Sequence, residues 1–224
     1  MSAMKTYLLI LGIACVAGFG PPAFAAPVYF TDLAQFNAAT ANTALVEDFT
    51  GQDGLKGSSF TSVGGLTFTR LTGTVNTQQL VVTPAGAGPY GPGSSTGILT
   101  DNREDDFRMD FANLTRAIGF DTYLNAVDAS GAVAAPEATI EIFGVGGVLI
   151  DTFIQTHSEL VVGFFGVIAD ENIESIRWTT TGGNVVNTGI DNILQGDAIP
   201  APGAITLFAV GLAALGAARR KRTL

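Results

Sequence analysis

The stretch that decides the fold is ATIEIFGVGGVLIDTF, residues 138–153. It holds two runs rich in β-branched and aromatic residues, Ala138–Val145 and Gly147–Phe153, on either side of a glycine turn. Two such runs around a short glycine-containing loop are typical of a β-hairpin. The segment therefore predicts two antiparallel strands and an all-β protein.

The same kind of pattern extends in both directions from this hairpin. Ile118 and Phe120 fall on one face of an expected strand, because side chains alternate between the two faces. Leu160–Val167 is typical of a buried strand, and Ile176 and Trp178 alternate in the strand expected after it. Some ten short strands separated by Gly, Asn, Asp and Pro turns predict a two-sheet antiparallel β-sandwich of jelly-roll-like topology.

One short helix is expected before the strands. Asp32 is a good N-cap residue and Gln35 follows three positions later, a spacing that favours a capped helix start. Leu33 and Phe36 would then share one helix face. We expect residues 26–198 to form a single domain that begins with this helix.

The charge of the chain excludes one class of partner. The 224 residues carry a formal net charge of −9, and five positive residues, Lys5, Arg219, Arg220, Lys221 and Arg222, lie near the two ends. Without these five positive charges the remainder carries −14. Because an acidic surface repels a polyphosphate backbone, we predict no nucleic-acid partner.

The N-terminal residues 1–25 are predicted to be a signal peptide. Lys5 precedes an apolar run, and the run is followed by the small-x-small sequence Ala23-Phe24-Ala25. This order of features is typical of a secretory signal that signal peptidase removes, here between Ala25 and Ala26. The only cysteine, Cys15, lies in this leader, so no disulfide is expected in the domain.

The C-terminal residues 199–224 predict a membrane-associated tail. Its parts are Pro200, Ala201, Pro202 and Gly203, an apolar run at 204–218, and the basic cluster Arg219, Arg220, Lys221 and Arg222. A helix over 204–218 would be about 22 Å long, shorter than the ~30 Å hydrocarbon core, so it predicts a marginal anchor. Positive residues stay on the cytoplasmic side, which places the domain outside the inner membrane.

This tail resembles the PEP-CTERM sorting tail of Gram-negative bacteria, with Ala201 where the family pattern has glutamate. The resemblance implies transient anchoring in the inner membrane and recognition by an exosortase-type protease. It also implies delivery to the outer surface or extracellular matrix, often beside exopolysaccharide. A plain single-pass anchor is the alternative for the same residues.

The interior is similar to a lectin-like sandwich module found in proteins with this tail. The resemblance is carried by the opening helix with Phe36 and by four further segments, Val46–Phe49, Ala117–Asp121, Phe164–Val167 and Gly189–Ile193. In such modules an acid of the first strand and an acid of the last strand can hold a structural ion. The resemblance thus implies a calcium site at Glu47 and Asp191, with Asp48 as a neighbour, since calcium takes six to eight oxygen ligands. The alternative is that both are exposed acids at strand ends.

Catalysis finds little support in the sequence. His157 is the only histidine, and it lies in the polar stretch 155–159, which is typical of a surface turn. One histidine and no cysteine outside the leader also disfavour zinc. We therefore predict no catalytic residues, while a secreted hydrolase that uses paired carboxylates remains the alternative.

Aromatic residues are the candidates for sugar stacking. Trp178 alternates with Ile176 in a strand, where a core position is more usual, and Tyr90 lies in a Gly/Pro-rich stretch. Taken together, the sequence predicts an exported surface or matrix protein with a binding or structural β-sandwich that recognises exopolysaccharide.

Overall fold

The structure is a computed structural model that describes residues 25–71, 80–83, 98–101, 106–125, 137–156, 161–181 and 187–199. These residues form one helix, α1 (Leu33–Ala39), and twelve strands. The strands are β1 (Val28–Phe30), β2 (Thr40–Glu47), β3 (Gly54–Gly57), β4 (Ser59–Thr61), β5 (Thr67–Arg70), β6 (Leu80–Thr83), β7 (Ile98–Asp101), β8 (Phe107–Asn125), β9 (Glu137–Gly144), β10 (Val148–Thr156), β11 (Val162–Thr181) and β12 (Asn187–Ala198).

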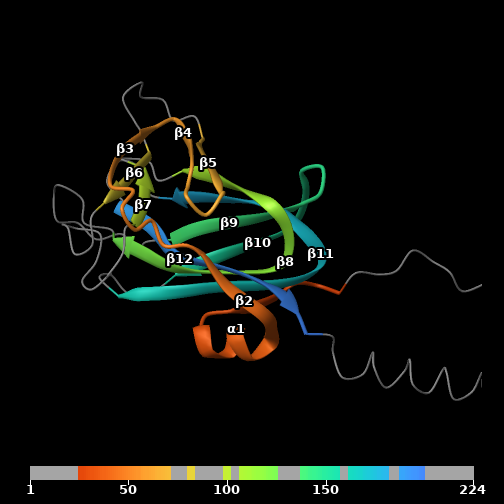
Figure 1. The fold of residues 1–224 in the computed structure, drawn as a ribbon. Helices are drawn as coiled ribbons and strands as arrows, with labels where there is room; N and C mark the ends of the chain where they lie inside the picture. Colours follow the sequence, from red (N-terminus) through yellow and green to blue (C-terminus); the bar gives the residue numbers. More distant parts are fainter. Residues whose placement is uncertain are drawn as a thin grey trace, which may run out of the picture.

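Two long strands, β8 and β11, build both layers of the molecule (Figure 1). They pair antiparallel, and their register shifts between Ile168 and Ile173. Sheet I has the order β4-β5-β8-β11-β9-β10 and uses the first half of β8 and the second half of β11. Sheet II uses the other halves of these two strands. In it β1 pairs with β11 and β12 pairs with β8. Strand β12 pairs in turn with β2 and with β7, which continues to β6 and β3. The predicted two-sheet antiparallel sandwich is therefore confirmed.

One detail of the strand prediction was wrong. Leu160–Val167 and the Ile176–Trp178 segment were expected to be separate strands, yet they belong to the single strand β11. The reason is the irregular register around residues 168–173, since a bulge bends a strand without ending it. The predicted hairpin is confirmed, with Gly146 and Gly147 in its turn at φ of 76° and 73°.

The core fills the space between the sheets and is strongly aromatic. Trp178 lies 6.1 Å from Phe107 in a stacked arrangement and 6.2 Å from Phe120, measured between ring centroids. All three side chains are buried. Because Phe107 and Trp178 are cross-strand partners of β8 and β11, the same contacts that fill the core also fix the strand register.

Helix α1 covers the outer face of sheet II. Its N-cap is Asp32, whose carboxylate accepts a hydrogen bond from the Gln35 amide at 2.8 Å, as predicted. Phe36 is buried on the sheet, whereas Leu33 is 43% exposed and does not share that contact. Gly119 and Gly166 are opposite each other in the register, and a Cβ at Gly166 would lie 2.7 Å from the Phe36 ring. The paired glycines therefore make room for the helix.

The two ends of the described chain lie at the same end of the sandwich (Figure 1). The Ala25 amide donates a hydrogen bond to the Asp170 carboxylate at 3.0 Å, and the Ile199 amide donates to the Ala39 carbonyl at 3.4 Å. Among the described residues, no helix is long and apolar enough to cross a membrane. The C-terminal helix expected at 204–218 lies outside these residues.

Candidate functional site

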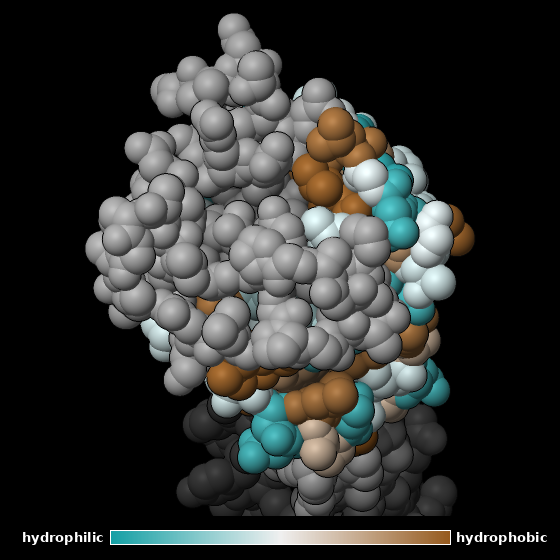
Figure 2. All heavy atoms as spheres, turned by 90° about the vertical axis from the view of Figure 1, so that its left-hand side faces the viewer, coloured by the Kyte–Doolittle hydropathy of each residue, from teal (hydrophilic) through white to brown (hydrophobic). Residues whose placement is uncertain are grey.

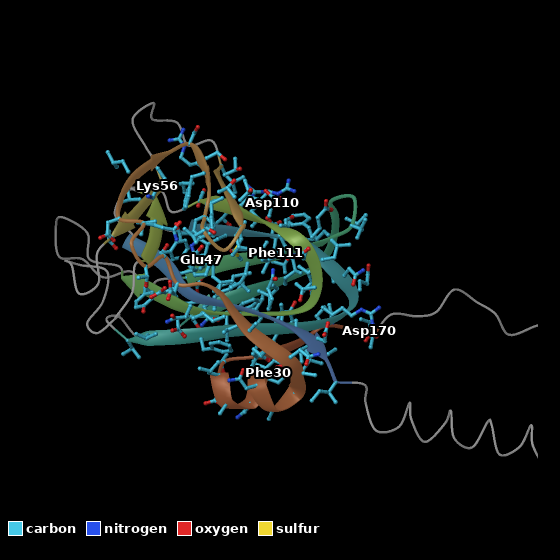
Figure 3. All side chains as sticks on the ribbon, viewed as in Figure 1. Phe30, Glu47, Lys56, Asp110, Phe111 and Asp170 are labelled. Carbon is cyan, nitrogen blue, oxygen red and sulfur yellow. The ribbon has the colours of Figure 1, made fainter. Side chains whose placement is uncertain are left out.

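Glu47, one of the two predicted calcium ligands, is buried and hydrogen-bonded within the protein (Figure 3). Its Oε1 atom accepts from the Phe49 amide at 2.6 Å and from Gln52 Nε2 at 2.7 Å. Its Oε2 atom accepts from the Gly64 amide at 2.8 Å. A carboxylate offers about four lone-pair positions, so three N–H donors occupy most of this one. The expectation of an exposed strand-end acid is wrong for Glu47, which ties the end of β2 to the loop before β5.

A shallow hollow lies beside Glu47. Its volume is about 290 Å³, and it is lined by Leu45, Val46, Glu47, Asp48, Thr50, Gln52, Val63 and Gly64. Of the apolar lining residues, Leu45 and Val63 are 54% and 86% exposed. Figure 2, which views the molecule from the left-hand side of Figure 1, shows polar and apolar described residues side by side along the margin of that face.

Asp191, the second predicted calcium ligand, is also buried, so the expectation of an exposed acid is wrong here as well. Its Oδ1 accepts from the Asn192 amide at 2.8 Å. Asp191 is the cross-strand partner of Asp121, and Asn192 donates from Nδ2 to Asp121 Oδ2 at 2.7 Å. Asn192 has a φ of 49°, a left-handed conformation that asparagine tolerates and that accompanies the register shift after Asp191. Sequence reasoning missed Asp121, because only the pairing of β8 with β12 places it opposite Asp191.

The Asp121 carboxyl gives a pH-dependent prediction. Burial raises its pKa above the ordinary value, although the Asn192 hydrogen bond acts in the opposite direction. The folded protein therefore holds a costly charge at neutral pH, and this cost disappears below about pH 4, where the group is protonated in both states. We expect Asp121→Asn to melt at a higher temperature than the parent at pH 7, with the difference shrinking as the pH falls to 4.

Asp197→Asn is the matched control for this measurement. Asp197 is exposed and also accepts from an asparagine side chain, Asn42 Nδ2, at 3.3 Å. We expect the melting temperature of this variant to follow that of the parent across the pH range. A pH-independent gain in Asp121→Asn would contradict the burial argument and would point to a packing effect.

The described residues contain no group of three or more His, Cys, Asp or Glu side chains that could hold a metal ion. Glu47 and Asp191 are two acids, and calcium needs six to eight oxygen ligands. Backbone carbonyls or water would have to supply most of the shell, while Glu47 is already engaged by N–H donors. The calcium site therefore stays a prediction.

The two aromatic candidates for sugar stacking fare differently. Trp178 is 1% exposed, and its Nε1 donates to Thr188 Oγ1 at 3.1 Å inside the core. It therefore belongs to the core and offers no face to a sugar. Tyr90 and His157 lie outside the described residues. Ala23 and the tail residues Pro200, Ala201, Pro202, Gly203, Arg219, Arg220, Lys221 and Arg222 lie outside them too.

The outer face of sheet I carries polar side chains that the strand pairing arranges in rows. One row crosses all six strands in register: Ser59, Thr69, Arg108, Arg177, Glu141 and Thr152. Strands in a sheet lie about 4.8 Å apart, so this row is about 24 Å long. The neighbouring row includes Thr61, Thr67, Asp110, Ser175 and Phe143; Asp110 is labelled in Figure 3.

A pocket of about 230 Å³ opens on this face. It is lined by Leu71, Arg108, Phe143, Gly147, Ser175 and Arg177. Sequence reasoning missed these residues. The alternation of Arg108 with buried Phe107 and Met109, and of Arg177 with Ile176 and Trp178, marks both arginines as outward-facing. Which outward residues of different strands become neighbours follows only from the pairing.

No protein-family model matches the chain, and no curated protein matches it. Among solved structures, the chain is similar to a mutant of CBM29-2, described as a family 29 carbohydrate-binding module, with 14% sequence identity and a TM-score of 0.35. The match covers 70% of this chain and 88% of that one. The likeness is remote, and the fold assigned above rests on this chain's own strand pairing.

Proposed function

We propose that this chain is an exported surface or extracellular-matrix protein whose β-sandwich binds polysaccharide. The observation that carries the proposal is the outer face of sheet I, where hydroxyl, guanidinium and carboxylate groups form rows across six paired strands. Sugar hydroxyls both donate and accept hydrogen bonds. Ser and Thr hydroxyls do the same, Arg only donates, and ionised Asp and Glu only accept. Side chains on paired strands are held in fixed order, which suits a chain of repeating units.

Export and sorting are a second part of the proposal. The N-terminal leader and the sorting tail of residues 199–224 predict signal peptidase and an exosortase-type protease as processing partners, with transient anchoring in the inner membrane. In the described residues, β1 and the end of β12 lie at the same end of the sandwich (Figure 1), a placement compatible with a tether at that end.

Polysaccharide binding can be tested by affinity electrophoresis of the full-length protein in gels that contain neutral or acidic polysaccharides. Retardation by at least one polymer, reversed by its soluble oligosaccharides, is the expected result. Retardation by none would contradict the binding function and leave a structural role.

The sorting proposal has its own test. Intact mass and cell fractionation would be measured in the native host with and without the tail-processing protease. A mature species that lacks residues 1–25 and the basic tail, found outside the inner membrane, is expected when the protease is present. Retention of the full tail in the inner membrane in both strains would leave only a plain anchor.

Calcium is a further proposal for the same domain. A structural ion at Glu47 and Asp191 would bind the folded state and so stabilise it by mass action. The proposal predicts that a chelator lowers the melting temperature of the purified protein and that calcium, but not magnesium, restores it. An identical melting temperature with chelator and with saturating calcium would contradict the proposed site.

The alternative function is a carbohydrate-active hydrolase with paired carboxylates. One observation favours it: Asp121 and Asp191 are cross-strand partners, and burial raises the pKa of Asp121. Against it, Asp191 has no exposed surface, so it cannot contact a polymer in this conformation. Release of reducing ends from a bound polysaccharide, abolished by Asp121→Asn, would establish the hydrolase; we expect no release.

A further inference from the structure

Two arginines face each other on the outer face of sheet I. Arg108 of β8 and Arg177 of β11 are direct cross-strand partners, and each side chain is 44% exposed. The Cβ atoms of such partners are typically about 4.5–5.5 Å apart, and like charges in this position destabilise a sheet. Asp110 and Glu141 each offset one of these charges, and an anion bound between the two guanidinium groups would offset them further.

The acids that accompany the arginines do not line the pocket between them. Arg108 forms an ion pair with Asp110 at 2.6 Å, and Arg177 forms one with Glu141 at 3.4 Å. A guanidinium has five N–H donors in a planar fork, so one carboxylate partner leaves donors unused. The pocket lining contains both arginines and neither acid. The charged groups that line the pocket are therefore both guanidinium groups, and the carboxylates paired with them lie beside it.

The rest of the lining fits the body of a sugar. Leu71 and the partly buried ring of Phe143 add apolar surface, whereas the lining residue Ser175 is only 1% exposed. An aromatic or aliphatic wall suits the C–H face of a sugar ring. At about 230 Å³ the pocket is smaller than the roughly 300–1,000 Å³ of sites for drug-sized ligands, so it suits one monosaccharide unit.

The rim of the pocket is fixed by the β9–β10 turn. Gly147 lines the pocket, and its amide and that of Gly146 donate to Glu174 Oε2 at 3.3 and 2.8 Å. Glu174 is therefore occupied by the turn and is not part of the lining. These two hydrogen bonds tie the β9–β10 turn to strand β11 beside the pocket.

We propose that this pocket binds the carboxylate of a uronic acid unit in an acidic polysaccharide, with Arg108 and Arg177 as its two cationic contacts. This inference rests on the proposed polysaccharide-binding function and names its ligand class. Arg pairs with carboxylates through two parallel hydrogen bonds, which lysine cannot reproduce. The general repulsion from a chain of net charge −9 is screened beyond about 8 Å at physiological ionic strength, whereas direct contacts in the pocket are screened much less.

The test compares polygalacturonate oligomers with their fully methyl-esterified counterparts, which share the backbone but lack the charge. Binding to the full-length protein would be measured by calorimetry. We expect the acid form to bind and the ester to bind roughly 10-fold more weakly or worse. Arg108→Gln and Arg177→Gln should each weaken binding of the acid form by roughly 10- to 100-fold, and Arg177→Lys should recover only part of the loss.

Arg116→Gln is the matched control, because Arg116 is an exposed arginine of the same strand β8 and does not line the pocket. It removes the same charge and should leave binding unchanged. An equal loss in Arg116→Gln would overturn the inference in favour of a general charge effect. The melting temperature of each variant would show that it is folded.

The outcomes distinguish failure of the uronate pocket from failure of the proposed polysaccharide binding. If acid and ester bind equally, or if the pocket variants bind like the parent, the uronate pocket is overturned while polysaccharide binding stands. If the protein binds neither these oligomers nor the polymers of the electrophoresis test, both proposals fail. The uronate pocket is supported if the parent binds the acid form more tightly than the ester. It also requires that the Arg108 and Arg177 variants, but not Arg116→Gln, bind the acid form more weakly.

Discussion

Glu47→Ala is expected to lower the free energy of unfolding by about 3–5 kcal/mol. The Glu47 carboxylate is buried and accepts from two backbone amides and from the Gln52 side chain at 2.6–2.8 Å. Removing the carboxylate leaves these three N–H donors without their acceptor at a buried position. Losses of this kind cost about 1–3 kcal/mol for each buried group.

The measurement is urea unfolding, with the slope compared as well as the midpoint to show that the unfolded state is unchanged. Asp48→Ala is the control, since the neighbouring Asp48 accepts only from the exposed Thr50 amide at 3.0 Å among the hydrogen bonds described. We expect its cost to stay below about 1 kcal/mol. Both variants would be measured with chelator and with calcium.

The comparison between the two conditions decides what Glu47 does. A purely structural Glu47 predicts the same loss of stability in both. A loss that appears only with calcium would contradict the structural role and make Glu47 a calcium ligand. Glu47→Ala within about 1 kcal/mol of the parent in both conditions would contradict both readings.

Trp178→Ala is expected to cost about 3–5 kcal/mol and to lower the melting temperature by roughly 10 °C. Trp178 is buried between Phe107 and Phe120 and is hydrogen-bonded to Thr188. Its removal would leave a cavity in the centre of the aromatic core. Trp178→Phe keeps most of the ring and should cost about half as much.

A second readout separates this core role from sugar binding. Trp178 is the only tryptophan in the chain, so its fluorescence reports one site. We expect the emission to be that of a buried indole and to stay unchanged when polysaccharide is added. Quenching by a bound polysaccharide, together with nearly parental stability of Trp178→Ala, would place Trp178 at the ligand and contradict the core assignment.

Local sequence determined the β9–β10 hairpin and the start of helix α1. The hairpin at residues 138–153 follows from apolar alternation around a glycine turn, and the α1 start follows from Asp32 and its spacing to Gln35. Both depend on interactions within a few residues, which a sequence displays directly. The alternation of Ile176 and Trp178 likewise determined that Trp178 faces the core.

Only the tertiary structure decides which residues from distant parts of the chain lie next to each other. A register shift near residues 168–173 made one bent strand of two expected ones, and the pairing of Gly119 with Gly166 created the seat for Phe36. Burial of Glu47 depends on the loop that reaches it at Gly64, seventeen positions away. Arg108 and Arg177 lie far apart in the chain and meet only across the β8–β11 ladder. Cross-strand register is a non-local property, so no local pattern could have placed these groups together.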